Sequence, residues 1–99
     1  MLVLKLENAP PRLIGYCSSW AIQVATYVFV ARLPAVAREV IWEQVVRLAT
    51  DRTNAVMIWS SASKEQGLDF CILGEPRRHP EEIEGFVVST YTPLAEDRP

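Results

Sequence analysis

The pattern of apolar and polar positions divides the chain into short segments with either strand or helix character. Residues 2–6 form a run of Leu and Val interrupted by Lys5, which is typical of a strand. Pro10 and Pro11 follow, and proline is tolerated at the first turn of a helix because its missing N–H has no intrahelical partner there. The next apolar residues recur at helical spacing and predict an amphipathic helix over residues 10–24, with an apolar face made by Leu13, Cys17, Trp20 and Val24.

The middle of the chain continues this alternation. Residues 27–31 are aromatic and β-branched and predict a buried strand, and Pro34 then opens the longest predicted helix. A polar turn over residues 51–54 ends that helix. Residues 55–59 are continuously apolar, as in a central strand, and residues 68–72 alternate, so the two segments predict an antiparallel hairpin with Gly67 in its connection.

The C-terminal part contains more residues that interrupt regular secondary structure. Residues 75–80 predict an exposed loop bounded by prolines, and residues 81–84 a single acidic turn. Residues 86–92 predict a last strand, ended by Pro93. We therefore expect one domain over residues 1–93, followed by a frayed tail over residues 94–99.

The predicted order is strand, helix, strand, helix and then three strands. Two helices and mostly antiparallel pairing favour an α/β (α+β) two-layer sandwich of ferredoxin-like type, although the hairpin expected between the helices is compressed to one strand. The strongly β-prone last strand lies beyond this core, which favours its pairing with another chain.

Charge is distributed unevenly along the chain. Its 99 residues carry a net charge of −2, but residues 1–64 hold seven basic and four acidic side chains, and residues 65–99 hold three basic and eight acidic ones. This asymmetry suggests a basic surface for an anionic ligand and an acidic C-terminal region for a basic partner, unless the charges are simply solvated. Eight of the ten basic residues are Arg, whose planar fork suits phosphate.

Several kinds of site are disfavoured by the sequence. Cys17 and Cys71 have no metal-ligand spacing and no secretory leader ahead of them, so we expect reduced packing residues and a cytoplasmic protein. His79 is the only histidine, which argues against a histidine metal cluster or a catalytic triad. No apolar stretch is long enough to predict a membrane span.

Two sets of residues are candidates for chemistry. Glu7 ends the first strand, and we expect it to meet Arg12 at the start of the following helix. A metal at Glu7 needs more ligands than one chain offers, but a two-fold dimer would bring a second Glu7 close if the strand ends face each other. Arg77 and Arg78 are the best candidates for contacts to a phosphate backbone.

Five stretches in the right order resemble the CRISPR-associated protein 2 family, in its type I-E branch. They are residues 7–13 (ENAPPRL), 38–44 (REVIWEQ), 56–59 (VMIW) and 74–78 (GEPRR), with Gly85 opening the final strand.

The resemblance implies a ferredoxin-like homodimer that bridges dimers of the integrase, CRISPR-associated protein 1, and holds spacer-precursor DNA. It assigns DNA contacts to Arg12, Arg38, Arg77 and Arg78. It assigns contacts with the integrase to the acidic positions Glu65 and Glu84 and to the final strand, here Phe86, Val87 and Val88. Ile14, Tyr16 and Val36 depart from the branch pattern, which has basic residues at Ile14 and Tyr16, so we expect fewer phosphate contacts.

Two other functions are kept open. Members of the family are often named as endonucleases, which would make Glu7 from both subunits a catalytic and metal-binding residue for Mg²⁺ or Mn²⁺. In the type I-E branch the integration role does not need this site, so the resemblance favours a subunit that is not itself catalytic. The other alternative is a strand-swapping interaction module that does not bind nucleic acid.

Overall fold

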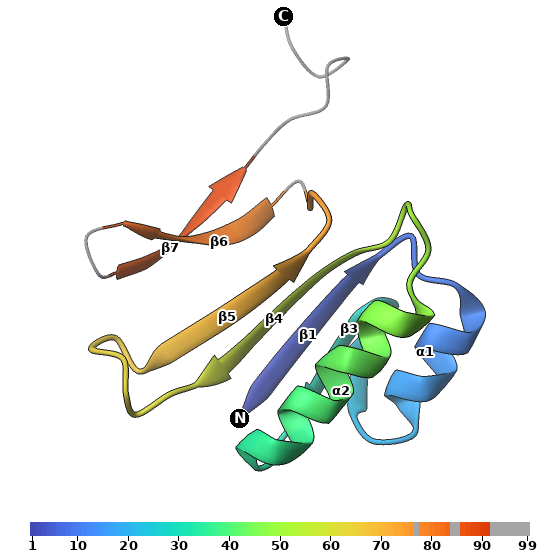
Figure 1. Cartoon of the computed structure of the whole chain (residues 1–99), viewed down its shortest axis with the longest axis horizontal. Helices are drawn as coiled ribbons and strands as arrows, with labels where there is room; N and C mark the ends of the chain where they lie inside the picture. Colours follow the sequence, from blue (N-terminus) through green and yellow to red (C-terminus); the bar gives the residue numbers. More distant parts are fainter. Residues whose placement is uncertain (77, 84–85, 92–99) are drawn as a thin grey trace, which may run out of the picture.

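The computed structural model describes residues 1–76, 78–83 and 86–91. The expectations for Arg77, Glu84, Gly85, Thr92, Pro93 and the tail over residues 94–99 therefore lie outside the described residues. The elements are β1 (Leu2–Glu7), α1 (Pro11–Ser18), β2 (Ile22–Ala25), β3 (Val28–Ala31), α2 (Ala35–Leu48), β4 (Asn54–Ser60), β5 (Leu68–Leu73), β6 (Arg78–Ile83) and β7 (Phe86–Tyr91) (Figure 1).

The first five of these strands form one antiparallel sheet, in the order β2-β3-β1-β4-β5. β1 lies at its centre, and Leu4 pairs with Phe29 of β3 on one side and with Met57 of β4 on the other. β6 and β7 make a separate two-stranded sheet. The fold is thus α+β with two helices on a mostly antiparallel sheet, and the order β2-β3-β1-β4 is consistent with a ferredoxin-like fold.

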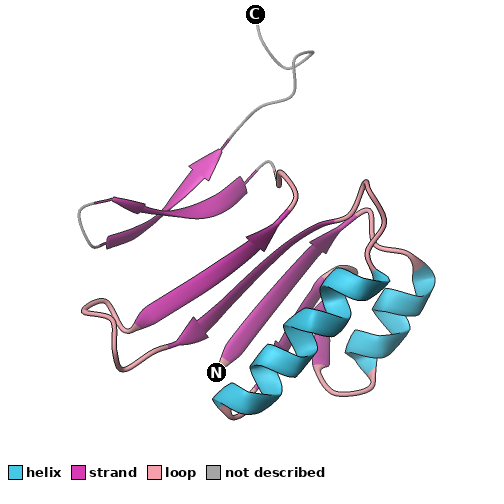
Figure 2. Ribbon diagram, viewed as in Figure 1, coloured by secondary structure: helices cyan, strands magenta, loops and turns pink. Residues whose placement is uncertain are grey.

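Both helices cover the same face of the five-stranded sheet (Figure 2). In β1 the side chains alternate, so Leu2, Leu4 and Leu6 are at most 2% exposed under the helices, while Val3, Lys5 and Glu7 belong to the opposite face. The helices contribute Leu13, Cys17, Ile41 and Val45 to the core. We call the opposite face, which carries Val3, Lys5, Glu7, Val56 and Ile58, the helix-free face.

The first helix is shorter than the predicted segment over residues 10–24, and this prediction was wrong beyond Ser18. The hydroxyls of Ser18 and Ser19 donate to the carbonyls of Ile14 (2.9 Å) and Tyr16 (2.6 Å), which competes with further helical hydrogen bonds. Residues 22–25, rich in β-branched side chains, then form β2 and pair with β3. The hairpin between the helices is therefore present and not compressed.

The region of the predicted loop and acidic turn over residues 75–84 was also misjudged. Residues 78–83 form β6, which pairs with β7 throughout its length. Pro80, opposite Ser89, lies at a pair that exchanges no backbone hydrogen bonds, because the polar groups of Val87 two residues away point away from β6. The strand β6 therefore includes Pro80, although the prolines on either side of residues 77–79 predict a loop.

The remaining elements agree with the sequence. α2 follows Pro34 as predicted, and β4 and β5 form the predicted hairpin with Gly67 at φ +82° in its connection. Within the described residues, neither helix is long and apolar enough to cross a membrane.

Candidate nucleic-acid and partner interfaces

The end of β1 is held by a compact set of polar contacts. Asn8 adopts a positive φ of 53°, a conformation that asparagine tolerates better than most residues. The buried hydroxyl of Thr53 donates to the carbonyl of Asn8 (3.0 Å), and the Asn8 side chain donates to the carbonyl of Arg52 (3.4 Å). The start of β4 thus fixes the turn between β1 and α1.

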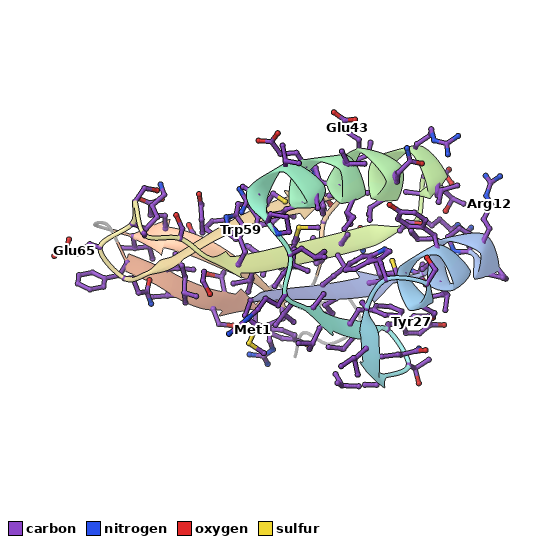
Figure 3. All side chains as sticks on the ribbon, turned by 90° about the horizontal axis from the view of Figure 1, so that it is seen from below. Met1, Arg12, Tyr27, Glu43, Trp59 and Glu65 are labelled. Carbon is purple, nitrogen blue, oxygen red and sulfur yellow. The ribbon has the colours of Figure 1, made fainter. Side chains whose placement is uncertain are left out.

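Glu7 forms an ion pair at this strand end, but not with the expected partner. Its Oε1 lies 3.3 Å from Nζ of Lys5, two residues earlier on the same face of β1, and the Glu7 side chain is 25% exposed. Arg12 lies in the first turn of α1 and is exposed to solvent (Figure 3). The expected meeting of Glu7 with Arg12 is therefore replaced by a pairing with Lys5, which the two-residue period of a strand could have indicated.

The surroundings of Glu7 do not resemble a metal centre within one chain. Among the described residues, no group of three His, Cys, Asp or Glu side chains is placed to hold a metal ion. The ammonium group of Lys5 beside the carboxylate would also repel a divalent cation. Glu7 and Lys5 lie on the helix-free face, where the described residues bring no second carboxylate into an ion-binding group with Glu7.

Arg38 is positioned by an aromatic residue from another element. Its Cζ lies 4.3 Å from the ring centroid of Trp59, which β4 brings under the first turns of α2. No carboxylate of the described residues is paired with the guanidinium. Stacking restricts the side chain and leaves its donor groups available for an anion.

A cavity of about 400 Å³ opens beside this pair. Trp42, Met57 and Cys71 line it together with Arg38 and Trp59, and Glu39 and Glu43 complete its wall. Met57 of β4 and Cys71 of β5 place this cavity on the helix side of the sheet. Figure 1 shows that neither helix extends over β5.

The three predicted DNA-contacting arginines that the structure describes do not form one cluster. Arg38 lies near the start of β1, since Trp59 pairs with Leu2, whereas Arg12 follows the far end of that strand. The 14 residues of α2 between these ends span about 21 Å. Arg78 lies on β6, with Cζ 5.0 Å from the ring centroid of Tyr91. Arg77 lies outside the described residues.

The positions that depart from the family pattern are explained in part by packing. Ile14 and Tyr16 lie partly buried against the core, where a charged side chain would lose its hydration. Val36 is 74% exposed on α2 and nothing in the structure requires it to be apolar.

Four of the predicted partner-binding residues, Glu65, Phe86, Val87 and Val88, lie at one end of the part of the molecule that the structure describes. Glu65 is exposed in the loop between β4 and β5 (Figure 3), and the next residue, Gln66, is hydrogen-bonded to the backbone of Val87 in β7. Phe86 and Val88, on either side of Val87, are 56% and 40% exposed. The contact through Gln66 had no signal in the sequence, because it joins a loop and a strand 21 residues apart.

The two cysteines are packing residues with free thiols, as predicted. Cys17 is fully buried in the core, and Cys71 packs against it. Burial raises the pKa of Cys17 to about 11 and that of Cys71 to about 12. Neither thiol is therefore poised for nucleophilic chemistry.

The chain matches the model of a known protein family. The model of a family described as CRISPR-associated protein (Cas_Cas2CT1978) matches residues 1–88. The match covers both helices and the whole five-stranded sheet.

Proposed function

The chain belongs to the CRISPR-associated protein family Cas_Cas2CT1978, and from this membership we propose that it is the small subunit of a CRISPR spacer-acquisition complex. In this role a homodimer of the chain bridges dimers of the integrase, CRISPR-associated protein 1, and holds spacer-precursor DNA without carrying out the transfer chemistry. The observation that carries the proposal is the family match over residues 1–88.

The placement of the basic side chains supports DNA holding. Arg12 and Arg38 lie at opposite ends of the helical layer, a separation that suits contacts to phosphates along a duplex better than a single small anion. The guanidinium of Arg38 lies closer to its aromatic partner, 4.3 Å from the Trp59 centroid, than that of Arg78, which lies 5.0 Å from the Tyr91 centroid. Arg77 and Arg78 belong to the same proposal.

The gathering of Glu65, Phe86, Val87 and Val88 at one end supports a partner interface there. The hairpin of β6 and β7 exposes apolar side chains that a monomer leaves without cover, and Glu65 lies beside it. A protein partner with apolar and basic groups fits this surface. We assign the integrase to it, with Glu84 as a further contact.

We also propose a ferredoxin-like fold and a homodimer formed through the helix-free face. The β6–β7 hairpin of the same chain faces Val3 and Ile58 across a cavity. The part of this face toward β2 and β3 is apolar at Val28 and Val30, and Ile22 on the edge strand β2 is 71% exposed. An apolar sheet face without helices is a surface that a second copy could cover.

We do not assign an endonuclease activity to the chain, because Glu7 is paired with Lys5 and stands without nearby ligands in the described residues. The test is incubation with DNA and RNA in the presence of Mg²⁺ or Mn²⁺. Cleavage by the wild type that disappears in Glu7→Gln would overturn this part of the proposal.

The decisive experiment mixes the purified chain with the cognate integrase and a spacer-length DNA duplex. We expect a stable complex in size-exclusion chromatography and integration that depends on both proteins. Failure to form the complex, together with integration that does not need this chain, would contradict the proposal. Binding to the integrase with no salt-dependent DNA binding would instead favour an interaction module without nucleic acid.

A further inference from the structure

A single side chain holds both backbone polar groups of one residue in β7. Nε2 of Gln66 donates to the carbonyl of Val87 (3.2 Å), and Oε1 of Gln66 accepts from the N–H of Val87 (2.5 Å). The primary amide thus makes the two hydrogen bonds that a residue of a neighbouring strand would make.

These groups of Val87 belong to the outer edge of β7. Val87 faces Glu82 of β6 in the register, yet both of its polar groups go to Gln66, so this pair exchanges no backbone hydrogen bonds. In an antiparallel pair the direction of these groups alternates, so those of Ser89 point to the same outer edge. Gln66 therefore stands where an added strand would lie.

The loop that carries Gln66 is itself ordered by hydrogen bonds. The N–H of Ser61 donates to the carbonyl of Gly67 (2.8 Å), and the N–H of Gly67 donates to the carbonyl of Lys64 (3.0 Å). Gly67 supplies the positive φ of 82° that this turn needs. These two hydrogen bonds restrict the backbone on both sides of Gln66 and so restrict the position of its side chain.

The hairpin that Gln66 holds has little other support. β6 and β7 contact chiefly each other, and Ile83 and Phe86 are 50% and 56% exposed. A cavity of about 290 Å³ separates the hairpin from the helix-free face, with Val3 and Ile58 on one wall and Pro80 and Val88 on the other. A two-stranded hairpin alone is marginally stable in water, and an open edge attracts further strands.

We propose that Gln66 caps the outer edge of β7 and competes with an incoming strand, so that a partner protein adds a strand to β7 only by displacing the Gln66 amide. The occupant of the edge is an extended segment with basic side chains, because Glu81 and Glu82 are exposed on the adjacent strand. A second copy of β7 fits less well, because its residues Phe86–Tyr91 include no basic side chain to face these carboxylates. The inference rests on the proposed function, in which the integrase supplies this segment.

The test compares Gln66→Ala with wild type and with Ser63→Ala, a control in the same loop that leaves the amide in place. Hydrogen exchange followed by NMR on the free proteins measures how strongly the Gln66 side chain protects the backbone amide of Val87. We expect the Val87 amide to exchange roughly tenfold faster in Gln66→Ala, with β1 and β4 amides unchanged, as for loss of one or two exposed hydrogen bonds.

The second measurement is the affinity of each full-length protein for the integrase. We expect Gln66→Ala to bind roughly three- to tenfold more tightly than wild type and Ser63→Ala, because the partner strand no longer displaces the amide. Unchanged or weaker binding by Gln66→Ala would overturn the competition while leaving the proposed function standing. Absence of binding by wild type and both variants would overturn the proposed function and the inference together.

Discussion

The guanidinium of Arg38 stacks on the indole of Trp59, with Cζ 4.3 Å from the ring centroid. The two residues come from α2 and β4, so a residue of the sheet positions the side chain of an arginine on the helix. A stacked arginine pays less side-chain entropy when it binds phosphate. This pair is therefore the most specific structural support for the proposal that the helical layer contacts DNA.

We expect Arg38→Ala to weaken binding to duplex DNA about equally for different sequences. The slope of log affinity against log salt should fall by about 1, the value for one lost phosphate contact. Fluorescence anisotropy at several salt concentrations measures both quantities. Trp59→Leu should weaken binding less, because the charge remains while its positioning is lost.

Arg47→Ala is the matched control, because it removes the same charge from the same helix. Nε and Nη2 of Arg47 already donate to Oε1 of Gln44, at 3.0 and 2.6 Å. An equal loss of affinity in Arg47→Ala would indicate that net charge, and not the stacked pair, determines binding.

A second prediction concerns the two glycines whose surroundings differ most. Gly74 has φ +75°, and an added Cβ would overlap Oδ1 of Asn54 and lie 3.0 Å from the carbonyl of Thr53. The same Asn54 oxygen accepts the N–H of Glu75 (2.9 Å), so it is not free to move. We expect Gly74→Ala to lower the free energy of unfolding by about 1–3 kcal/mol.

Gly15 provides the opposite case. It lies inside α1, and a Cβ there would meet nothing within 4 Å. We expect Gly15→Ala to raise the free energy of unfolding by about 0.5–1 kcal/mol. Urea titrations of both variants measure the free energy of unfolding. A Gly74→Ala variant as stable as the wild type would contradict the prediction and would mean that the turn after β5 can change its conformation around Asn54.

The order of most elements followed from the sequence because local chemistry determines it. Alternation in β1, the prolines before both helices and the apolar run of β4 each act within a few residues. The end of α1 was missed because Trp20 and Val24 continue the helical spacing beyond Ser18, where serine hydroxyls end the helix. β6 was missed because Pro80 and its acidic neighbours resemble a loop until the pairing with β7 is known.

The candidate site was predicted less completely than the fold. Glu7 at the end of β1 was predicted, but its pairing with Lys5 was not. The stacking of Arg38 on Trp59 and the cap of Gln66 on Val87 join residues 21 positions apart in each case. Such contacts depend on tertiary packing and leave no local pattern in the sequence.

The buried thiols predict a dependence of stability on pH. Burial raises the pKa of Cys17 and Cys71 from 9.0 to about 11 and about 12, so the folded chain keeps thiol protons that the unfolded chain loses first. The stability that these groups provide is complete below pH 9 and is lost as the pH rises toward 11 and 12. Urea unfolding at pH 8 and pH 10.5 should show the decrease.

The variant with both cysteines replaced by alanine is the control for this decrease. It should be less stable at pH 8, because two packed side chains are shortened, but its stability should fall less between the two pH values. An identical fall in wild type and variant would assign the effect to other groups, such as Tyr16, whose pKa burial also raises.

A fourth prediction tests the proposed homodimer with substitutions at two residues whose side chains are similarly exposed. Ile22 on β2 and Val36 on α2 are 71% and 74% exposed, so aspartate at either position should leave the fold intact. Ile22→Asp places a charge beside the helix-free face and should shift the protein to a monomer in analytical ultracentrifugation. Val36→Asp should leave the dimer unchanged, and dissociation by Val36→Asp alone would place the interface on the helices.

The last prediction separates the folded body from the β6–β7 hairpin, to which we assign partner binding. The core residues with little exposure lie between Leu2 and Met57, and Cys71 and Leu73 pack against them. The hairpin is joined to this body through Gln66 and the walls of the cavity beside Val3 and Ile58. A chain ending at Pro76 should therefore unfold cooperatively, with a free energy of unfolding lower by about 1–2 kcal/mol for the apolar surface and hydrogen bonds lost. Circular dichroism during denaturation tests the fold, and pull-down tests binding to the integrase, which we expect to disappear. A truncated chain that is unfolded would make the hairpin part of the core, and one that is folded and still binds the integrase would place the partner interface on the body.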